Sequence, residues 1–232
     1  MSNNFKSQTN FHPDETMLVD FSAGTLATGP SICVSAHLHF CSQCKAKLMR
    51  LDQVGSQLMC EANPIDLDDG AFDAMMEKID SDSLDSSPGR SACAKTESSE
   101  NLLGFPYAVS KLVKNNLVSK TWKRLSGSVD IARFKTGQEE FEVALHKICA
   151  GGKTPKHDHK GLEYTVVLKG SFSDESAVYR EGDFLVRKPG DVHQPMGAQN
   201  GECICLSALS APIKLTNPLG FLMKPWLRIN PM

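Results

Sequence analysis

Two histidines and a glutamate at fixed spacing constrain this chain more than any other feature. His157 and His159 stand two residues apart, and Glu163 follows, in a segment bounded by Gly151 and Gly170. Residues two apart on a strand point to the same side, so both imidazoles can face one interior, and the glutamate can add a carboxylate from the adjoining strand. The segment therefore predicts a metal site inside a β structure.

A second segment supplies a third imidazole. It runs through Gly182, Pro189 and Gly190 to His193. Three histidines and one glutamate form a mixed nitrogen and oxygen ligand set that accepts zinc, iron, manganese, nickel or copper, so the ligands do not identify the metal. The alternative is a metal-free barrel with surface histidines. His146 fits neither segment and is expected elsewhere on the barrel.

The region around these segments has the period of short strands. Phe141, Val143 and Leu145 alternate with residues expected on the other face, and more strands are expected at 164–168, 177–179, 184–187 and 203–209. Glycine- and proline-rich turns separate them. Many short strands joined by such turns imply a sandwich or a barrel.

Two cysteines share one face of the last expected strand. If Cys203 and Cys205 point inward, both thiols could act near the metal as ligands or redox partners. If they point outward or pack in the core, they are inert, which is common for buried cysteine.

The first 80 residues have a helical period instead. Pro13 suits a first helical turn, with Asp14 and Glu15 favourably placed at its positive end. Apolar residues recur at helical spacing in four stretches, the first weakening near Gly24 and the second beginning after a separator at Gly29–Pro30. The third stretch is expected to continue after a short break near Cys41–Cys44.

The helical region is also acidic. Residues 1–80 hold 11 Asp and Glu against 5 Lys and Arg, whereas residues 101–232 hold 12 against 18. Such a unit is a poor candidate for binding nucleic acid and a reasonable one for binding a basic protein, although the acidic residues could also merely solvate a helical surface.

A second metal site is predicted within these helices. His37, Cys41 and Cys44 form H-x3-C-x2-C, and on one continuous helix they would lie within an arc of about 60°. Imidazole and thiolate ligands suit a structural, tetrahedral zinc ion, and His12 at the start of the preceding helix is the expected fourth ligand. The alternative is two buried cysteines and a hydrogen-bonded core histidine.

The boundary between the two regions is expected in a serine-rich stretch. Residues 81–100 contain seven serines and few apolar side chains, a composition that cannot offset the entropy cost of ordering. We therefore predict a helical domain at 1–80, a flexible linker at 81–110 and a barrel domain at 111–232.

Composition favours a cytoplasmic location. No apolar run approaches the ~20 residues needed to span a bilayer, and the N-terminus has no basic region followed by an apolar run, so neither a membrane segment nor a secretory signal is expected. Eight cysteines in such a chain are more often ligands or redox-active thiols than structural disulfides.

The two barrel segments are similar to the two cupin motifs, with His157, His159, Glu163 and His193 in the ligand places. The second motif departs from the pattern: Pro189 is one place late, and Gly197 stands where asparagine is customary. These departures leave the ligand set intact and count against cupin-type catalysis.

The whole chain resembles the ChrR branch of the zinc-binding anti-sigma factors. The resemblance rests on H-x3-C-x2-C in an acidic helical unit, the preceding His-Pro-Asp-Glu and the C-terminal barrel, and it leaves out mainly the linker and the extreme N-terminus. It implies a regulator, not an enzyme, whose helical domain binds and occludes an extracytoplasmic-function sigma factor. It implies zinc on His12, His37, Cys41 and Cys44.

The resemblance also implies a role for the barrel. Its metal, zinc or another divalent transition metal, would be needed for the response to singlet oxygen or organic hydroperoxides, with Cys203 and Cys205 close by. Damage to the barrel could alter domain docking or expose the linker to a cytoplasmic protease. No direct contact with nucleic acid or membrane is expected.

Two other functions stay open. A cupin with three histidines and a glutamate could be a dioxygenase or an isomerase with an accessory helical domain. Alternatively, oxidation of Cys41 and Cys44 could expel zinc and open the helical domain, which would leave the barrel without a role.

Overall fold

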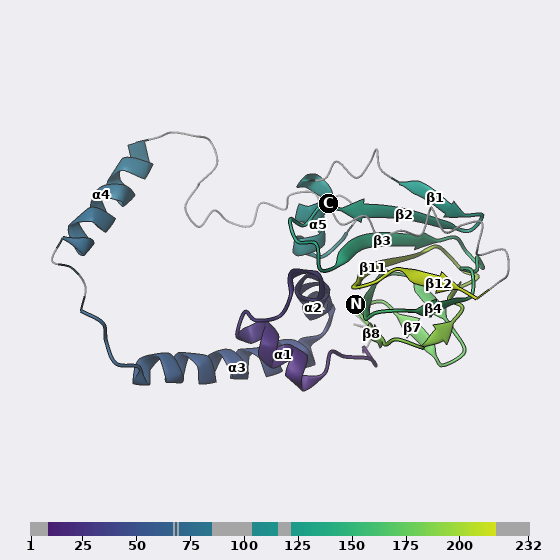
Figure 1. The fold of residues 1–232 in the computed structure, drawn as a ribbon, viewed down its shortest axis with the longest axis horizontal. Coiled ribbons are helices and arrows are strands. Elements are labelled where there is room, and N and C mark those ends of the chain that lie inside the picture. Colours follow the sequence, from purple (N-terminus) through teal and green to yellow (C-terminus); the bar gives the residue numbers. More distant parts are fainter. Residues whose placement is uncertain (1–8, 67, 69, 85–103, 116–121, 217–232) are drawn as a thin grey trace, which may run out of the picture.

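The computed structural model describes residues 9–66, 68, 70–84, 104–115 and 122–216, in which helices precede strands as the sequence predicted (Figure 1). The helices are α1 (Glu15–Ser22), α2 (Thr28–Phe40), α3 (Ser42–Glu61), α4 (Ala71–Leu84) and α5 (Tyr107–Asn115). The strands are β1 (Lys123–Ser126), β2 (Val129–Phe134), β3 (Glu142–Ile148), β4 (His157–His159), β5 (Glu163–Lys169), β6 (Ser171–Ser173), β7 (Val178–Arg180), β8 (Phe184–Arg187), β9 (Val192–His193), β10 (Met196–Gly197), β11 (Cys203–Leu209) and β12 (Ile213–Leu215).

The strands form an antiparallel barrel around one large sheet. That sheet has the order β1-β2-β3-β11-β5-β8, and two smaller sheets have the orders β10-β6-β7 and β12-β4-β9. Every residue of the central strand β11 is buried. One apolar cluster joins the inner face of the large sheet to Phe172 of β6 and Tyr179 of β7, so this cluster is the interior of the barrel.

The start of α1 follows from its sequence. Asp14 is the N-cap, and its Oδ1 accepts a hydrogen bond of 2.8 Å from the backbone N–H of Met17. Met17 and Leu18 are buried, and the chain turns at Gly24 with a φ of +72° that glycine tolerates best. The expected separator at Gly29–Pro30 was wrong: both residues lie in the first turn of α2, where a proline needs no hydrogen-bonded N–H.

Helix α2 lies on the outer face of the large sheet and shares its core. Cys33, Val34 and Ala36 are fully buried in the same apolar cluster as Leu206 of β11. The approach is close at Gly29, where an added Cβ would lie 2.6 Å from the Cβ of Phe141. Helix α2 is therefore packed directly on the barrel.

The predicted linker, 81–110, has helices at both of its ends. Helix α4 continues to Leu84 and α5 begins at Tyr107, with Phe105 and Val109 buried in the core that α2 also joins. Residues 85–103 between them lie outside the described residues, so the division into domains remains a prediction.

The remaining helices lead away from the barrel. Helix α3 begins beside α1 and extends outward, and α4 lies apart from the body of the molecule (Figure 1). All α4 side chains from Phe72 to Ser81 are exposed. Among the described residues, no helix has the length and apolar character required to cross a membrane.

Candidate metal centres

The first candidate centre lies where α2 ends and α3 begins. The two helices are separate, because Cys41 is at once the C-cap of α2 and the N-cap of α3, with its Sγ 3.3 Å from the backbone N of Cys44. The break expected near Cys41–Cys44 is present, so the arc of about 60° on one continuous helix does not apply. His37 lies in the last turn of α2 and Cys44 in the first turn of α3, and the break still gathers all three side chains.

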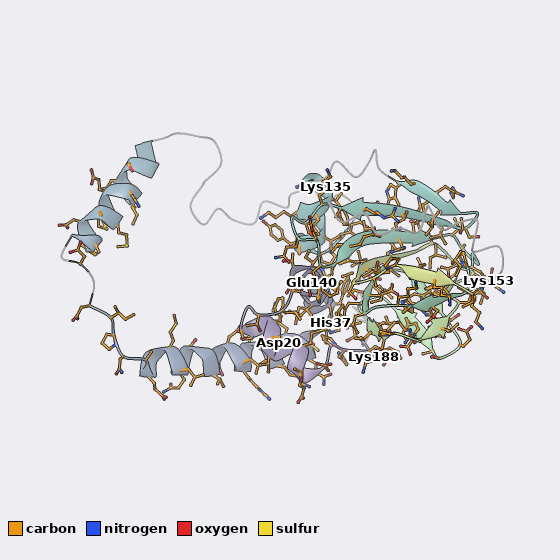
Figure 2. The ribbon with its side chains drawn as sticks, in the orientation of Figure 1. Asp20, His37, Lys135, Glu140, Lys153 and Lys188 are labelled. Atoms are coloured by element: carbon orange, nitrogen blue, oxygen red, sulfur yellow. The ribbon has the colours of Figure 1, made fainter. Side chains whose placement is uncertain are left out.

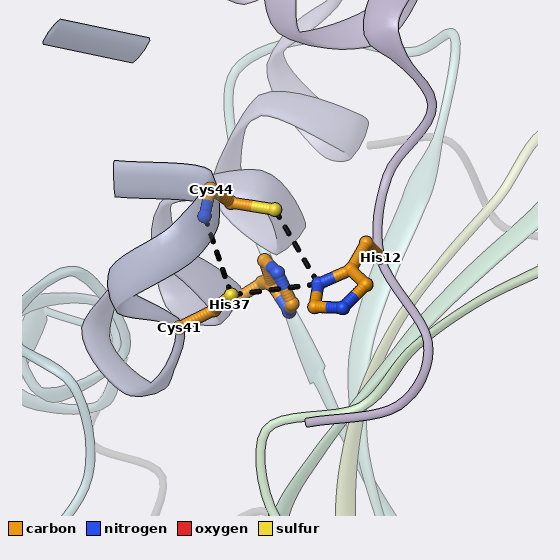
Figure 3. A group of neighbouring side chains, drawn as sticks. All are labelled: His12, His37, Cys41 and Cys44. Carbon is orange, nitrogen blue, oxygen red and sulfur yellow. Dashed lines mark hydrogen bonds between the residues drawn. The ribbon is translucent and has the colours of Figure 1, made fainter. Parts of the chain in front are cut away.

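The fourth predicted ligand reaches this cluster from an extended segment. His12 precedes α1 instead of beginning it, and its Nδ1 lies 3.4 Å from the Sγ atoms of both Cys41 and Cys44 (Figure 3). One ligand atom from each of these residues and His37 lies within 4.8 Å of the others. The structure thus brings all four predicted residues together.

The state of these side chains fits a zinc ion. His37 is fully buried and donates from Nδ1 to the carbonyl of Gly182 at 2.6 Å, while its Nε2 has no hydrogen-bond partner. Burial lowers the pKa of His37 to about 4, so the imidazole is neutral and Nε2 offers a free lone pair. Burial and the nearby Cys41 raise the pKa of Cys44 to about 12, which disfavours the thiolate. A bound cation would offset this effect by stabilising the thiolate.

The second candidate centre lies inside the barrel. His157 and His159 come from β4, Glu163 from the start of β5, and His193 from β9, which pairs with β4 so that His157 faces His193. The Nε2 atom of His193 lies 3.0 Å from that of His159 and 3.1 Å from that of His157. Ligand atoms of all four predicted residues lie within 4.8 Å of one another.

The protonation of this cluster also suits a metal. Burial lowers the pKa values of His157 and His159, which favours neutral imidazoles. Burial by itself would raise the pKa of Glu163, but the neighbouring histidines, His159 first, bring it below its ordinary value. Three imidazoles around one carboxylate are a ligand set for a divalent transition metal.

Residues that the sequence did not single out orient His193. Asp174 has a fully buried side chain, and its Oδ2 lies 3.0 Å from the Nδ1 of His193. Arg187 donates to the same Oδ2 at 2.6 Å and to the hydroxyl of Tyr179 at 2.8 Å. A carboxylate on the far nitrogen of a metal-binding histidine fixes its tautomer and ring position. In sequence Asp174 is one carboxylate of a polar turn, with no signal that separates it from surface residues.

A mostly apolar cavity of about 110 Å³ adjoins the barrel cluster, with Glu163 in its wall. His146 also lines this cavity, and its Nε2 lies 2.7 Å from the Ser207 hydroxyl, so its expected position away from the site was wrong. The remaining wall is largely aliphatic and aromatic, including Leu125, Val129, Ile148, Phe172, Leu185, Leu209, Ile213 and Leu215. The cavity can therefore hold a small apolar molecule beside the predicted metal.

The two cysteines of β11 point into the barrel. Cys203 and Cys205 are buried with their Sγ atoms 3.6 Å apart, and Cys205 lines the cavity together with His157. The hydrogen bond with Cys203 and burial raise the pKa of Cys205 well above its ordinary value. Both are free thiols, and Cys205 stays protonated at neutral pH.

Comparison with known proteins identifies the family of this fold. Residues 113–211 match the ChrR cupin-like domain. Over 218 residues the chain is 33% identical to the anti-sigma-E factor ChrR of Cereibacter sphaeroides, a match that covers 94% of this chain and 98% of that protein. The chain belongs to the ChrR family of anti-sigma factors.

One solved structure agrees with the ChrR assignment over most of the chain. The crystal structure of Rhodobacter sphaeroides SigE in complex with the anti-sigma ChrR matches with a TM-score of 0.71 and 30% identity, covering 87% of this chain and 99% of that chain. An RmlC-like cupin protein of Ralstonia eutropha matches with a TM-score of 0.38 and 20% identity, covering 42% of this chain and 67% of its own. The predicted family and the predicted order, a helical region and then a cupin barrel, are confirmed.

Proposed function

We propose that this ChrR-family anti-sigma factor binds and inhibits an extracytoplasmic-function sigma factor through α3 and α4. The ChrR of the matched crystal structure is in complex with SigE, and that chain aligns over 99% of its length. The match to a curated anti-sigma factor over 94% of this chain supports the same activity.

The exposed apolar side chains of α3 and α4 carry this proposal. Most of the large hydrophobic residues that are exposed in the described part of the chain lie between residues 49 and 79: Met49, Val54, Leu58, Met59, Ile65, Phe72, Met75, Met76 and Ile79. We call these nine residues the α3–α4 apolar surface. A surface of this kind marks a protein interaction site, because leaving it in water costs free energy.

Charge narrows the kind of partner. The first 80 residues carry 11 acidic against 5 basic residues. An acidic helical surface attracts the basic surfaces of a DNA-binding protein and could compete with promoter DNA for them. The sigma factor is therefore the expected occupant of the α3–α4 apolar surface, and the chain itself contacts neither nucleic acid nor membrane.

The helical centre serves this binding by fixing three segments to one another. We assign zinc to His12, His37, Cys41 and Cys44. His12 lies before α1, His37 lies in α2, Cys41 lies between α2 and α3, and Cys44 lies in α3. A zinc ion held by four protein ligands has no open position and contributes folding free energy instead of chemistry. Its absence would free α3, and with it half of the proposed binding surface.

The barrel centre is proposed to sense the signal in the cytoplasm. His157, His159, Glu163 and His193 would hold zinc or another divalent transition metal beside a cavity that also contains Cys205. We propose that singlet oxygen or organic hydroperoxides act here and cause release of the sigma factor, with Cys203 and Cys205 as oxidisable thiols. A cytoplasmic protease acting on the serine-rich linker could complete the release.

A pull-down of the full chain tests the proposal. Co-expression with the sigma factor encoded beside it should give a stable complex, which alanine at Cys41 or Cys44 abolishes. Alanine at His157 or Glu163 should leave the complex intact and blunt its release under oxidative stress. A full chain that retains no sigma factor would exclude the anti-sigma function.

The cavity beside the barrel centre supports one alternative, a cupin dioxygenase or isomerase. A small apolar substrate would fit between the predicted metal and the aliphatic wall. Turnover that depends on His157 and Glu163 but not on Cys41 would favour the enzyme.

A further inference from the structure

The turn between β7 and β8 of the barrel reaches the helical metal centre. This turn, residues 181–183, presents the carbonyl of Gly182 to the Nδ1 of His37 at 2.6 Å. Figure 2 labels His37 where the helices meet the barrel. Gly182 has a φ of +91°, and an added Cβ would lie 2.6 Å from the Thr9 Cγ2 and 2.7 Å from the Phe40 Cβ. Only a residue without a Cβ therefore fits between the side chains of Thr9 and Phe40 at this position.

The next residue in this turn, Asp183, binds the segment that carries His12. Its Oδ1 accepts hydrogen bonds from the backbone N–H groups of Asn10 at 2.7 Å and Phe11 at 3.2 Å. Its Oδ2 accepts a hydrogen bond of 2.8 Å from the backbone N–H of Arg180. The carbonyl of Phe11 in turn accepts a hydrogen bond of 3.0 Å from the N–H of Phe184. Phe11, directly before His12, is therefore fixed to the barrel through both its N–H and its carbonyl, and Asn10 is fixed through its N–H.

Burying this carboxylate is costly. Asp183 is fully buried, and within the described part of the chain its recorded partners are backbone N–H groups, with no ion pair. A buried charge without a cation requires several hydrogen bonds to offset its lost hydration. Two of the three hydrogen bonds that Asp183 accepts come from residues 10 and 11. Asp183 therefore orders the backbone that leads to His12.

We propose that Gly182 and Asp183 of the barrel position His37 and His12, so that the metal affinity of the helical centre depends on the barrel. This inference rests on the zinc site proposed above. Outer-shell partners of this kind typically change metal affinity by about 10–100-fold when they are removed. Strand β8 runs from this turn to Arg187, which binds Asp174 beside His193, so one short strand joins the surroundings of both centres.

Cobalt binding to the full chain tests the role of Asp183. Thiolate-to-cobalt absorption in the near ultraviolet reports the centre that contains Cys41 and Cys44, and competition with Zn²⁺ gives its relative affinity. Asp183→Asn replaces one carboxylate oxygen, which accepts hydrogen bonds from backbone N–H groups, with an NH2 group that cannot accept them. This variant should weaken cobalt binding by about tenfold or more. The matched control is Glu181→Gln, which removes one charge from an exposed side chain of the same turn.

A second variant disturbs the same contact from the segment before His12, without changing a barrel residue. Phe11 packs on Tyr179 with ring centroids 4.9 Å apart, so Phe11→Ala should loosen the segment before His12 and weaken cobalt binding in the same direction. Hydrogen exchange of metal-free protein supplies a readout independent of metal. Amides of residues 10–12 should exchange faster in both variants, while those of β11 stay protected.

The outcomes separate this inference from the zinc assignment. A wild-type chain without thiolate-to-cobalt absorption would overturn the zinc site and this inference with it. Wild-type absorption with unchanged affinity in both Asp183→Asn and Phe11→Ala would overturn the positioning role alone. If Asp183→Asn lost protection in β11 as well, Phe11→Ala would decide the question.

Discussion

The Nδ1 of His193 lies 3.0 Å from the Oδ2 of Asp174, whose side chain is completely buried. Hydrogen bonds from Arg187 and the backbone of Ser176 add to that of His193, and against the effect of burial they lower the pKa of Asp174 to about 2. The carboxylate is thus ionised and holds the Nε2 of His193 toward the other ligands.

Asp174→Asn should therefore weaken metal retention by the barrel about 10–100-fold. Metal content per chain after dialysis against graded chelator measures this, in a Cys44→Ser background that removes the other centre. Glu202→Gln, which breaks an exposed ion pair with Lys169, is the control and should change nothing. Equal retention by both variants would mean that Asp174 does not orient His193.

Cys44→Ser should remove zinc from the helical centre and abolish sigma binding, because a hydroxyl is a poor zinc ligand and α3 then loses its link to His12. Elemental analysis and a pull-down of the full chain measure the two effects. Cys60→Ser is the matched control, since this exposed cysteine lies on the same helix. Sigma binding that survives the loss of zinc would contradict a structural role for the metal.

Phe72→Ser should lower the affinity for the sigma factor about tenfold or more, with no change in thermal stability. The side chain is 63% exposed and contributes little to the fold, whereas burying a phenylalanine side chain in an interface stabilises by about 2 kcal/mol. Tyr107→Ser, also at an exposed aromatic residue but on α5, should bind normally. Calorimetry with the purified sigma factor gives both constants.

Glu163→Gln should leave sigma affinity unchanged and reduce the release that follows exposure to singlet oxygen or an organic hydroperoxide. The variant removes a carboxylate ligand from the barrel without touching α3 or α4. A sigma-dependent reporter and a binding assay separate the two effects, with Glu202→Gln, in an exposed ion pair with Lys169, as the control. Normal release in Glu163→Gln would show that the barrel metal is not needed for sensing.

His146→Gln should make the protein less sensitive to acid. Burial lowers the pKa of His146 from 6.5 to about 4, so between these values the unfolded chain binds more protons than the folded one. Stability must then fall as pH drops from about 6.5 to about 4, by at most about 3 kcal/mol for this one group. Urea unfolding at pH 7 and pH 4.5 measures the loss, which should be smaller in the variant. Identical losses would mean that His146 is charged in the folded state.

The barrel cluster was predictable because its geometry is local. Strand alternation places His157 and His159 on one side, and the motif spacing gives Glu163 and His193. Sequence reasoning also found the members of the helical cluster and the break near Cys41, but the arc that it gave for His37, Cys41 and Cys44 holds only on one continuous helix. Asp174 and Asp183 were missed because a buried carboxylate and an exposed one look alike in sequence.

The sequence of α2 itself indicates that this helix packs on the barrel. Residues 28–40 contain no Asp, Glu, Lys or Arg, and a helix without a charged face is generally buried on all sides. The acidic character of the first 80 residues as a whole hid this uncharged segment.

The shared core of α2 and β11 limits how this protein can be divided and recombined. A fragment ending near residue 84 would expose Cys33, Val34 and Ala36 to water, and a barrel expressed alone would expose the outer side of its central sheet. Chimeras that join these helices to a foreign sensor would need that sensor to reproduce the face presented by β5, β8 and β11. Substitutions in α2 and in the strands that it contacts are therefore expected to accumulate together in evolution, because each must preserve the packing between the helix and the barrel.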